Sequence, residues 1–419
     1  MRSTPPRTAV RRLALARGIS STGSEAAWIA LAVVVFAATG STMWLAMTLL
    51  LTWGVGGFIA PFTAMLGDRL PRRRVMIASD LGGAVLFGLM AMLHGPAVLL
   101  AVAFVAVIVE SPFWSASAAA IPNVAGEEHL GWANGLVAIG RNLGHVLGPA
   151  LGGLLVSALG SSWAFGLNAL SFAFSAVLVL SVHARFDAER AEAAVEEHRG
   201  SLAGLAFLVR EPVLRRLTIA WAVCSLGIGI AVVADLPLAR SFGAGAFGFG
   251  LISAAWGLGA VAGSFGGRWL KERSEFVVLV LANAAIAIVS AGIWLSPWFA
   301  LILALFVGFG LFDGITTVAN TSIIQRRSPD AVRSRTIGAQ EGVMNIVMAC
   351  AFLVGGLVLP ALGPQSVYAL AAISVGVATF VLLQLLGLHP PLSPAGAASS
   401  GHPVHLPSDP GPDAAGDRP

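Results

Sequence analysis

The sequence predicts an all-α polytopic membrane protein with twelve transmembrane helices in two pseudo-symmetric six-helix bundles. Of its 419 residues, 57% are apolar and 11% charged, and the mean hydropathy is +0.84. A water-soluble fold of this composition would lack the polar surface needed to cover itself. The apolar residues form runs of about 20, the length that crosses a bilayer core. One long charged stretch divides these runs six and six.

Each predicted span contains one such apolar run. The spans are 14–37, 42–65, 75–94, 97–120, 131–158, 162–182, 214–238, 246–269, 276–295, 298–321, 335–361 and 365–388. The first span follows an arginine-rich start, as the apolar region of a secretory signal peptide would. Its apolar part is too long for a signal peptide and another span follows directly, so we expect an uncleaved first helix.

Apart from Arg240, the basic residues of the loops lie on one side. They are Arg69, Arg72, Arg73, Arg74, the linker from Arg185 to Arg216, Arg268, Lys271, Arg273, Arg326, Arg327, Arg333 and Arg335. The opposite loops, such as "ATGST" and "GPQS", carry no charge. Because cytoplasmic loops hold the Lys/Arg excess, we expect a plasma-membrane protein with both termini in the cytoplasm. The placement of these basic residues in cytoplasmic loops also accounts for the isoelectric point near 10.0. A nucleic-acid-binding surface is not needed to explain it, so we expect no nucleic-acid partner.

Four regions follow from this pattern. Residues 1–185 form the first bundle, 186–212 a cytoplasmic linker with an amphipathic helix, 213–388 the second bundle, and 389–419 a disordered cytoplasmic tail rich in Pro, Ser and Gly. "ALGG" at Ala150–Gly153 and "LVGG" at Leu353–Gly356 end corresponding spans, as a duplicated six-helix unit predicts. Cys224 and Cys350 both lie in apolar runs, so we expect buried thiols and no disulfide.

The loop "AMLGDRLPRRR" resembles the signature loop of the major facilitator superfamily. Asp68, Arg69, Arg72 and Arg73 match that signature, whereas Ala64 and Pro71 replace its usual glycines. The resemblance implies that these charges pair with charges and helix ends of the other bundle, and so hold the cytoplasmic side shut. An ordinary positive loop is the alternative.

The stretch "GLVAIGRNLGHVLGPALGG" resembles the fifth-span signature of antiporters in that superfamily. The matching residues are Gly135, Gly144, Gly148, Pro149, Gly152 and Gly153. Small residues on one face let helices approach closely, and proline permits a bend. The resemblance implies export, while a generic small-residue interface remains the alternative.

Four charged residues fall at mid-membrane depth: Glu25, Glu110, Arg141 and Asp313. A charge there costs on the order of 3 kcal/mol, so each should face a cavity and have a partner. Glu110 and Arg141 fall at similar depth, and we predict that they pair or share a water-filled cavity. Transport or proton coupling is the leading interpretation of the acids, and helix-to-helix bonding the alternative.

Several other residues have a purely structural interpretation as well as a functional one. Asp235 lies near the outer end of its span, where we expect it to pair with Arg240. Glu341 is as well suited to a structural bond as to transport. Trp28 and Trp256 are candidates for lining a cavity for an apolar or cationic ligand, with packing as the alternative.

The stretches "IPNVAGEEHLGWANGL", "FGLNALSFAFSAVLVL" and "FLVREPVLRRL" resemble the enterobactin-exporter and macrolide-efflux branch of the superfamily. The resemblance implies proton-coupled efflux of a small, partly apolar drug, macrolide or siderophore by alternating access. An uptake symporter, a uniporter and a non-transport membrane subunit remain alternatives. We expect partners limited to this cargo, protons and the lipid bilayer, and a protein that functions as a monomer.

The sequence lacks the common motifs of nucleotide-binding, metal-binding, redox and hydrolase sites. It contains no GxxxxGK[ST], HExxH, CxxC or GxSxG pattern. We therefore expect no enzyme activity, no cofactor and no metal site.

Overall fold

The computed structural model describes residues 5–55, 70–184, 186–187, 201–266 and 275–386. Within these ranges every regular element is helical. Eleven of the described helices are long and apolar enough to cross a membrane, and a shorter apolar helix covers Thr42–Gly54. That helix lies in the predicted span 42–65, whose remainder falls outside the described residues. The all-α membrane fold expected from the sequence is therefore confirmed.

The first half contains α1 (Pro6–Thr39), α2 (Thr42–Leu49) with the π-helix η1 (Leu50–Gly54), α4 (Arg72–Met92), α5 (Pro96–Ala125), the short η2 (Glu127–His129), α6 (Leu130–Leu159) and α7 (Ser161–Leu180). The second half contains α8 (Ser201–Arg210), α9 (Pro212–Val232), α10 (Asp235–Ser241), α11 (Gly245–Ser264), α12 (Glu275–Leu295), α13 (Phe299–Arg327), α14 (Asp330–Leu362) and α15 (Val367–Leu386). The expected amphipathic segment from Ser201 to Val209 is helical in α8. The tail 389–419 lies outside the described residues.

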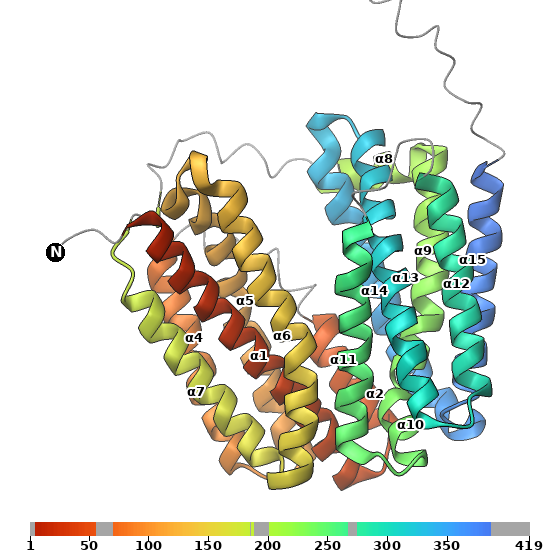
Figure 1. The fold of residues 1–419 in the computed structure, drawn as a ribbon, viewed down its shortest axis with the longest axis horizontal. Coiled ribbons are helices and arrows are strands. Elements are labelled where there is room, and N and C mark those ends of the chain that lie inside the picture. The colour runs from red at the N-terminus through yellow and green to blue at the C-terminus, as the bar shows by residue number, and fades with distance from the viewer. Residues whose placement is uncertain (1–4, 56–69, 185, 188–200, 267–274, 387–419) are drawn as a thin grey trace, which may run out of the picture.

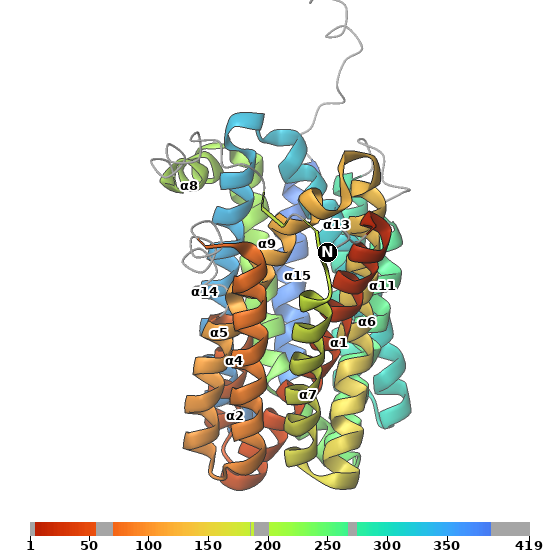
Figure 2. The ribbon, with the colours of Figure 1, turned by 90° about the vertical axis from the view of Figure 1, so that its left-hand side faces the viewer.

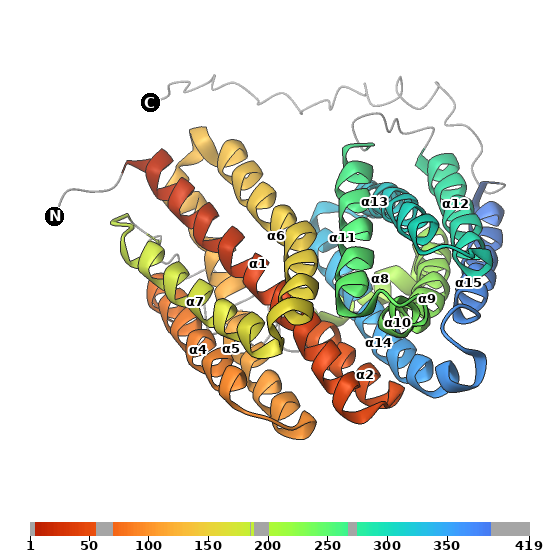
Figure 3. The same ribbon diagram turned by 60° about the horizontal axis from the view of Figure 1, so that its bottom comes forward.

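The two halves stand side by side as separate bundles (Figure 1). The start of α1 and the end of α15 lie at the same end of the molecule, which we call the termini end, and α8 lies across the second bundle there (Figure 2). The bundles approach each other at the opposite end, around α2, α6, α10 and α11 (Figures 1 and 3). We call this opposite end the closed end.

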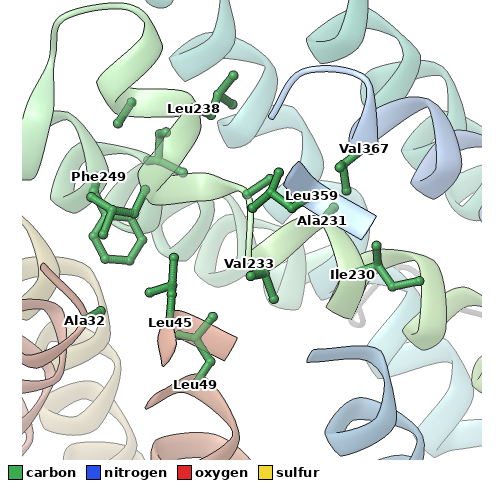
Figure 4. Packing of buried hydrophobic residues seen from close by; sticks show 14 of the residues in the cluster. Ala32, Leu45, Leu49, Ile230, Ala231, Val233, Leu238, Phe249, Leu359 and Val367 are labelled. Carbon is green, nitrogen blue, oxygen red and sulfur yellow. The ribbon is translucent and has the colours of Figure 1, made fainter. Parts of the chain in front are cut away.

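The hydrophobic cores follow this division. One buried cluster contains residues of both halves: Ala32, Leu45 and Leu49 pack with Phe249 and Leu359, among others, at the closed end (Figure 4). At the termini end the clusters are separate. One contains residues of the first half alone, from α1, α4, α5, α6, α7 and the segment that follows α7, and another contains residues of α8, α9, α12, α13 and α15. The halves therefore share a core at one end only.

Backbone glycines allow the close approach between the halves. A Cβ on Gly153 of α6 would lie 2.6 Å from the carbonyl oxygen of Ala246 in α11, and a Cβ on Gly250 would lie 2.4 Å from the carbonyl oxygen of Pro149. Besides this contact of α6 with α11, a second contact between the halves joins α14 to α2. There the Thr42 hydroxyl donates to the Gly356 carbonyl oxygen at 2.7 Å. Both repeated Gly-Gly segments therefore lie at the interface between the halves.

Two expectations about single residues are wrong. Asp235 accepts a hydrogen bond from the Tyr368 hydroxyl, whereas Arg240 lies 4.7 Å from the ring centre of Phe36 in the other half. Both residues lie on α10, where a separation of five residues turns the helix by about 140°, so Asp235 and Arg240 point toward different neighbours. Cys224 is buried as expected, but Cys350 is exposed, because its position on α14 faces away from the bundle.

Candidate functional site

A carboxylate and an imidazole meet where α1 packs on α6. Glu25 Oε1 lies 2.7 Å from His145 Nδ1, with side chains 19% and 45% exposed. The helices come this close because Gly148 lacks a side chain: a Cβ there would lie 2.5 Å from the Cβ of Glu25. Sequence reasoning missed His145. It lies inside the quoted fifth-span stretch, one turn after Arg141, and that position was its only signal.

His145 also lies against the other half. Its carbonyl oxygen would be 3.2 Å from a Cβ on Gly257 of α11, one turn along α6 from the contact of Pro149 with Gly250. The Glu25–His145 pair therefore sits beside the seam that joins the halves. A change in this pair can act directly on the α6 face that carries the seam.

Two further acids lie near Glu25 inside the first half. The charges that act on Glu110 of α5 are those of Asp80 and Glu25, and Glu110 Oε1 is buried without a hydrogen-bond partner. Asp80 of α4 is fully buried, and its Oδ2 accepts from the Ser175 hydroxyl of α7 at 2.7 Å. Three acids thus come from three neighbouring helices.

Sequence reasoning missed Asp80. The available signal was a single acid inside the apolar run "VMIASDLGGAVLF". An acid there has to find its partner across the bundle, since the neighbouring residues of its own helix are apolar or small.

The predicted pair of Glu110 and Arg141 is not formed. No hydrogen bond reaches Glu110 Oε1, while Arg141 is exposed and lies near the charge of Arg17 instead. Matching the depth of two residues on antiparallel helices does not specify the direction in which each side chain points. Rotation about the helix axes separates the two groups.

Asp313 belongs to a separate site in the second half. Its carboxylate on α13 accepts a hydrogen bond from Trp256 of α11 and lies near the thiol of Cys224. Glycines again bring the helices together, since a Cβ on Gly310 would lie 2.0 Å from the Trp256 carbonyl oxygen. Trp256 is 40% exposed. Trp28, by contrast, packs edge-on against Phe87, with ring centres 5.5 Å apart.

The charged loop motif is described only in part, because Asp68 and Arg69 lie outside the described residues. Arg72 Nη1 donates to the carbonyl oxygen of Ala119 at 2.9 Å, and Arg73 Nη2 to that of Leu180 at 2.6 Å. Both acceptors belong to the same half. The expectation that these two arginines bind the other half is therefore wrong for this conformation, in which they satisfy a carbonyl of α5 and one at the end of α7.

The fifth-span motif makes two kinds of contact. Gly144, Gly148 and Gly152 face α1, where added Cβ atoms would lie 2.6, 2.5 and 2.6 Å from their nearest neighbours, and Gly153 faces α11. Gly135 has no atom within 4 Å of an added Cβ and lies outside both seams. Helix α6 continues unbroken through Pro149.

Among the described residues there is no group of three or more His, Cys, Asp or Glu able to hold a metal ion. The site therefore consists of acids, a histidine and arginines on membrane helices, with two halves joined at one end. The family model described as Major Facilitator Superfamily matches residues 13–295 and 224–410. The chain belongs to this superfamily. It is a transmembrane transporter, a multi-pass protein of the cell membrane, in a family of transporters rather than enzymes.

Curated relatives extend over nearly the whole chain. The enterobactin exporter EntS of Citrobacter koseri is 26% identical over 404 residues, covering 93% of this chain and 95% of the relative. The enterobactin exporter EntS of Escherichia coli O157:H7 is 25% identical over 405 residues, covering 94% and 96%.

Solved structures share the fold. A point mutant of the nucleoside transporter NupG has a TM-score of 0.68 at 14% identity, covering 90% of this chain and 99% of that one. A bacterial homologue of the human lysosomal transporter Spinster, in an inward-facing and occupied conformation, also has a TM-score of 0.68 at 14% identity, with coverages of 92% and 96%.

Proposed function

We propose that this transporter exports a small, partly apolar molecule by alternating access, coupled to proton entry. The observation that carries the proposal is the contact of Glu25 with His145 at 2.7 Å, beside the seam between the halves. A carboxylate that gains and loses a proton at this place changes the bond between α1 and α6. Helix α6 in turn carries the contact with α11.

The conformation fits the first step of export. The halves share a core at the closed end and have separate cores at the termini end. The excess of basic residues in the loops supports a cytoplasmic location for the termini end. The protein is then open toward the cytoplasm, where cargo enters.

The proton step follows from the local chemistry. Protonation of Glu25 removes the charge that holds His145, which weakens the charge-assisted hydrogen bond between α1 and α6. The charges of Asp80 and Glu25 both act on Glu110, so Glu110 and Asp80 provide further positions for the proton inside the first half. The names of the relatives and the antiporter-type glycine motif support the outward direction of cargo.

Everted membrane vesicles that are acidified inside provide the test. The probes are enterobactin, which appears in the names of the relatives, and the macrolide erythromycin. We expect at least one probe to accumulate in vesicles with the wild-type protein and to dissipate the pH gradient, as followed by acridine orange fluorescence. Glu25→Gln should abolish this coupling while the protein still inserts.

Glu341→Gln is the matched control, since Glu341 is an exposed acid on α14. It should couple like the wild type. Probe accumulation that persists after nigericin collapses the pH gradient would contradict proton coupling. Entry of the probe only to equilibrium, unchanged by nigericin, would favour a uniporter. Activity that disappears only when sodium is replaced would reassign the coupling ion.

A further inference from the structure

Arg17 is a buried cation without an acidic partner among the described residues. It is 8% exposed on α1. Its Cζ lies 4.4 Å from the ring centre of Trp114 on α5, and its Nη1 donates to the Ser117 hydroxyl at 3.3 Å. Its Nε is buried with no hydrogen-bond partner. A buried charge is costly unless it is paired, and a ring face and one hydroxyl neutralise little of it.

A second cation lies beside it. Arg141 of α6 is exposed, and its charge is the one that acts on Arg17. Within the described ranges no carboxylate comes within ion-pair distance of either guanidinium. Arg141 lies one helical turn from His145, on the side of α6 that meets the second half farther along. It therefore borders the space between the halves, toward the end where their cores are separate.

The acids of the first half do not balance these arginines. Glu25 follows Arg17 by eight residues on α1, a rise of about 12 Å, and is held by His145. The charges that act on Glu110 are acidic. Along α1 and α5, Glu25 and Glu110 thus lie nearer the closed end than Arg17 and its contacts Trp114 and Ser117.

We propose that Arg17, Arg141 and Trp114 form a binding subsite for an oxyanion group of the cargo, such as a carboxylate, with aromatic or apolar parts beside it. This inference rests on the proposed transport function and names the substrate class: amphipathic organic anions. An oxyanion between the two guanidinium groups would accept charge-assisted hydrogen bonds and satisfy the free Nε of Arg17. Trp114 supplies a flat apolar surface beside the charge.

The test uses two probes of nearly the same shape, the anion 1-naphthoate and its neutral amide 1-naphthamide, in which an NH2 group replaces one carboxylate oxygen. Their binding to the purified full-length protein in neutral detergent is measured by isothermal titration calorimetry. We expect the wild type to bind the carboxylate about tenfold more tightly than the amide, as one charge-assisted hydrogen bond predicts. Arg17→Gln and Arg141→Gln should each remove this preference and leave amide binding unchanged.

Arg74→Gln is the matched control, since it removes an exposed arginine of α4 outside the subsite; it should keep the preference. Thermal unfolding checks each variant, and if Arg17→Gln does not fold, the exposed Arg141 position decides. Equal binding of both probes by the wild type, no binding of naphthoate up to its solubility, or a preference that survives at Arg141→Gln overturns the subsite.

A lipid headgroup phosphate offers the same oxyanion chemistry, so a second titration adds phosphatidylglycerol. Unchanged naphthoate affinity is expected for a cargo subsite, whereas complete competition overturns it in favour of a lipid. Because binding is measured without a pH gradient, loss of proton coupling in vesicles leaves the subsite standing. If the wild-type protein shows proton coupling in vesicles but no preference for naphthoate over naphthamide, the subsite is wrong and the proposed transport function stands.

Discussion

The two halves of this transporter treat their buried polar groups differently. In the first half, Arg17 Nε, Asp80 Oδ1 and Glu110 Oε1 are buried on membrane helices without hydrogen-bond partners. In the second half the hydroxyls of Thr218 and Ser328 are also buried without a partner. The buried acids there are paired, however: Asp235 accepts from Tyr368, and Glu275 Oε1 lies 3.0 Å from Arg326 Nη2. The amides of Asn320 and Gln340 bond each other. Buried polar groups in proteins are normally satisfied, so unsatisfied charge marks the places where a proton or ligand belongs. From this contrast we propose that the proton chemistry belongs to the first half and that these bonds of the second half are structural.

The largest effect should come from filling the seam between α1 and α6. Gly148→Leu would place a side chain on Glu25 and on the backbone at Thr22, where even a Cβ would come within 2.5 and 2.8 Å. Because both neighbours are held in the bundle, we expect destabilisation of about 3 kcal/mol or more and loss of the folded protein. Gly376→Leu on α15, which has open space around it, should express and unfold like the wild type. Yield and melting temperature in detergent measure both.

Neutralising acids in the two halves tests the contrast directly. Glu110→Gln and Asp80→Asn should each lower proton-coupled flux about tenfold or more without loss of stability, since they remove a buried charge that lacks full hydrogen bonding. Asp313→Asn, whose carboxylate is bonded to Trp256, should lower flux less. Vesicle assays at matched protein levels measure the three. Equal losses of proton-coupled flux in all three variants would contradict the proposed functional difference between the halves.

A double-mutant cycle probes the structural role of the second half. Asn320→Leu or Gln340→Leu alone leaves the other amide buried and unpaired, at a cost of about 1–3 kcal/mol. The double variant should be more stable than the sum of the single losses predicts. Thermal unfolding of the four proteins gives the coupling energy. Strict additivity would mean that the amide pair contributes nothing as a unit.

The smallest effect concerns the contact that joins α2 to α14. Thr42→Val removes the hydroxyl that donates to the Gly356 carbonyl and keeps the shape of the side chain. We expect a loss of about 1 kcal/mol of closed-end stability. Greater labelling of a cysteine placed at the closed end would report it. Unchanged labelling would mean that the shared hydrophobic core alone closes this end.

Much of the architecture could be predicted because the bilayer imposes it. Span lengths follow from membrane thickness, and the structure has helices in each predicted span. The site was harder to predict. Asp80 escaped notice, His145 was seen only as part of a glycine pattern, and Glu110 was matched with Arg141 on depth alone. Asp235 was assigned to Arg240 because the two are close in sequence, but Tyr368, far along the chain, is its partner.

The sequence by itself determined which segments enter the membrane and where charge is buried, because hydrocarbon tolerates only long apolar helices and makes each ionisable group conspicuous. Only the tertiary structure decided which of those groups meet. That outcome depends on the rotation of each helix about its axis, and the rotation is set where glycines let distant segments touch. Gly148 brings Glu25 to His145, and Gly153 brings α6 to the second half.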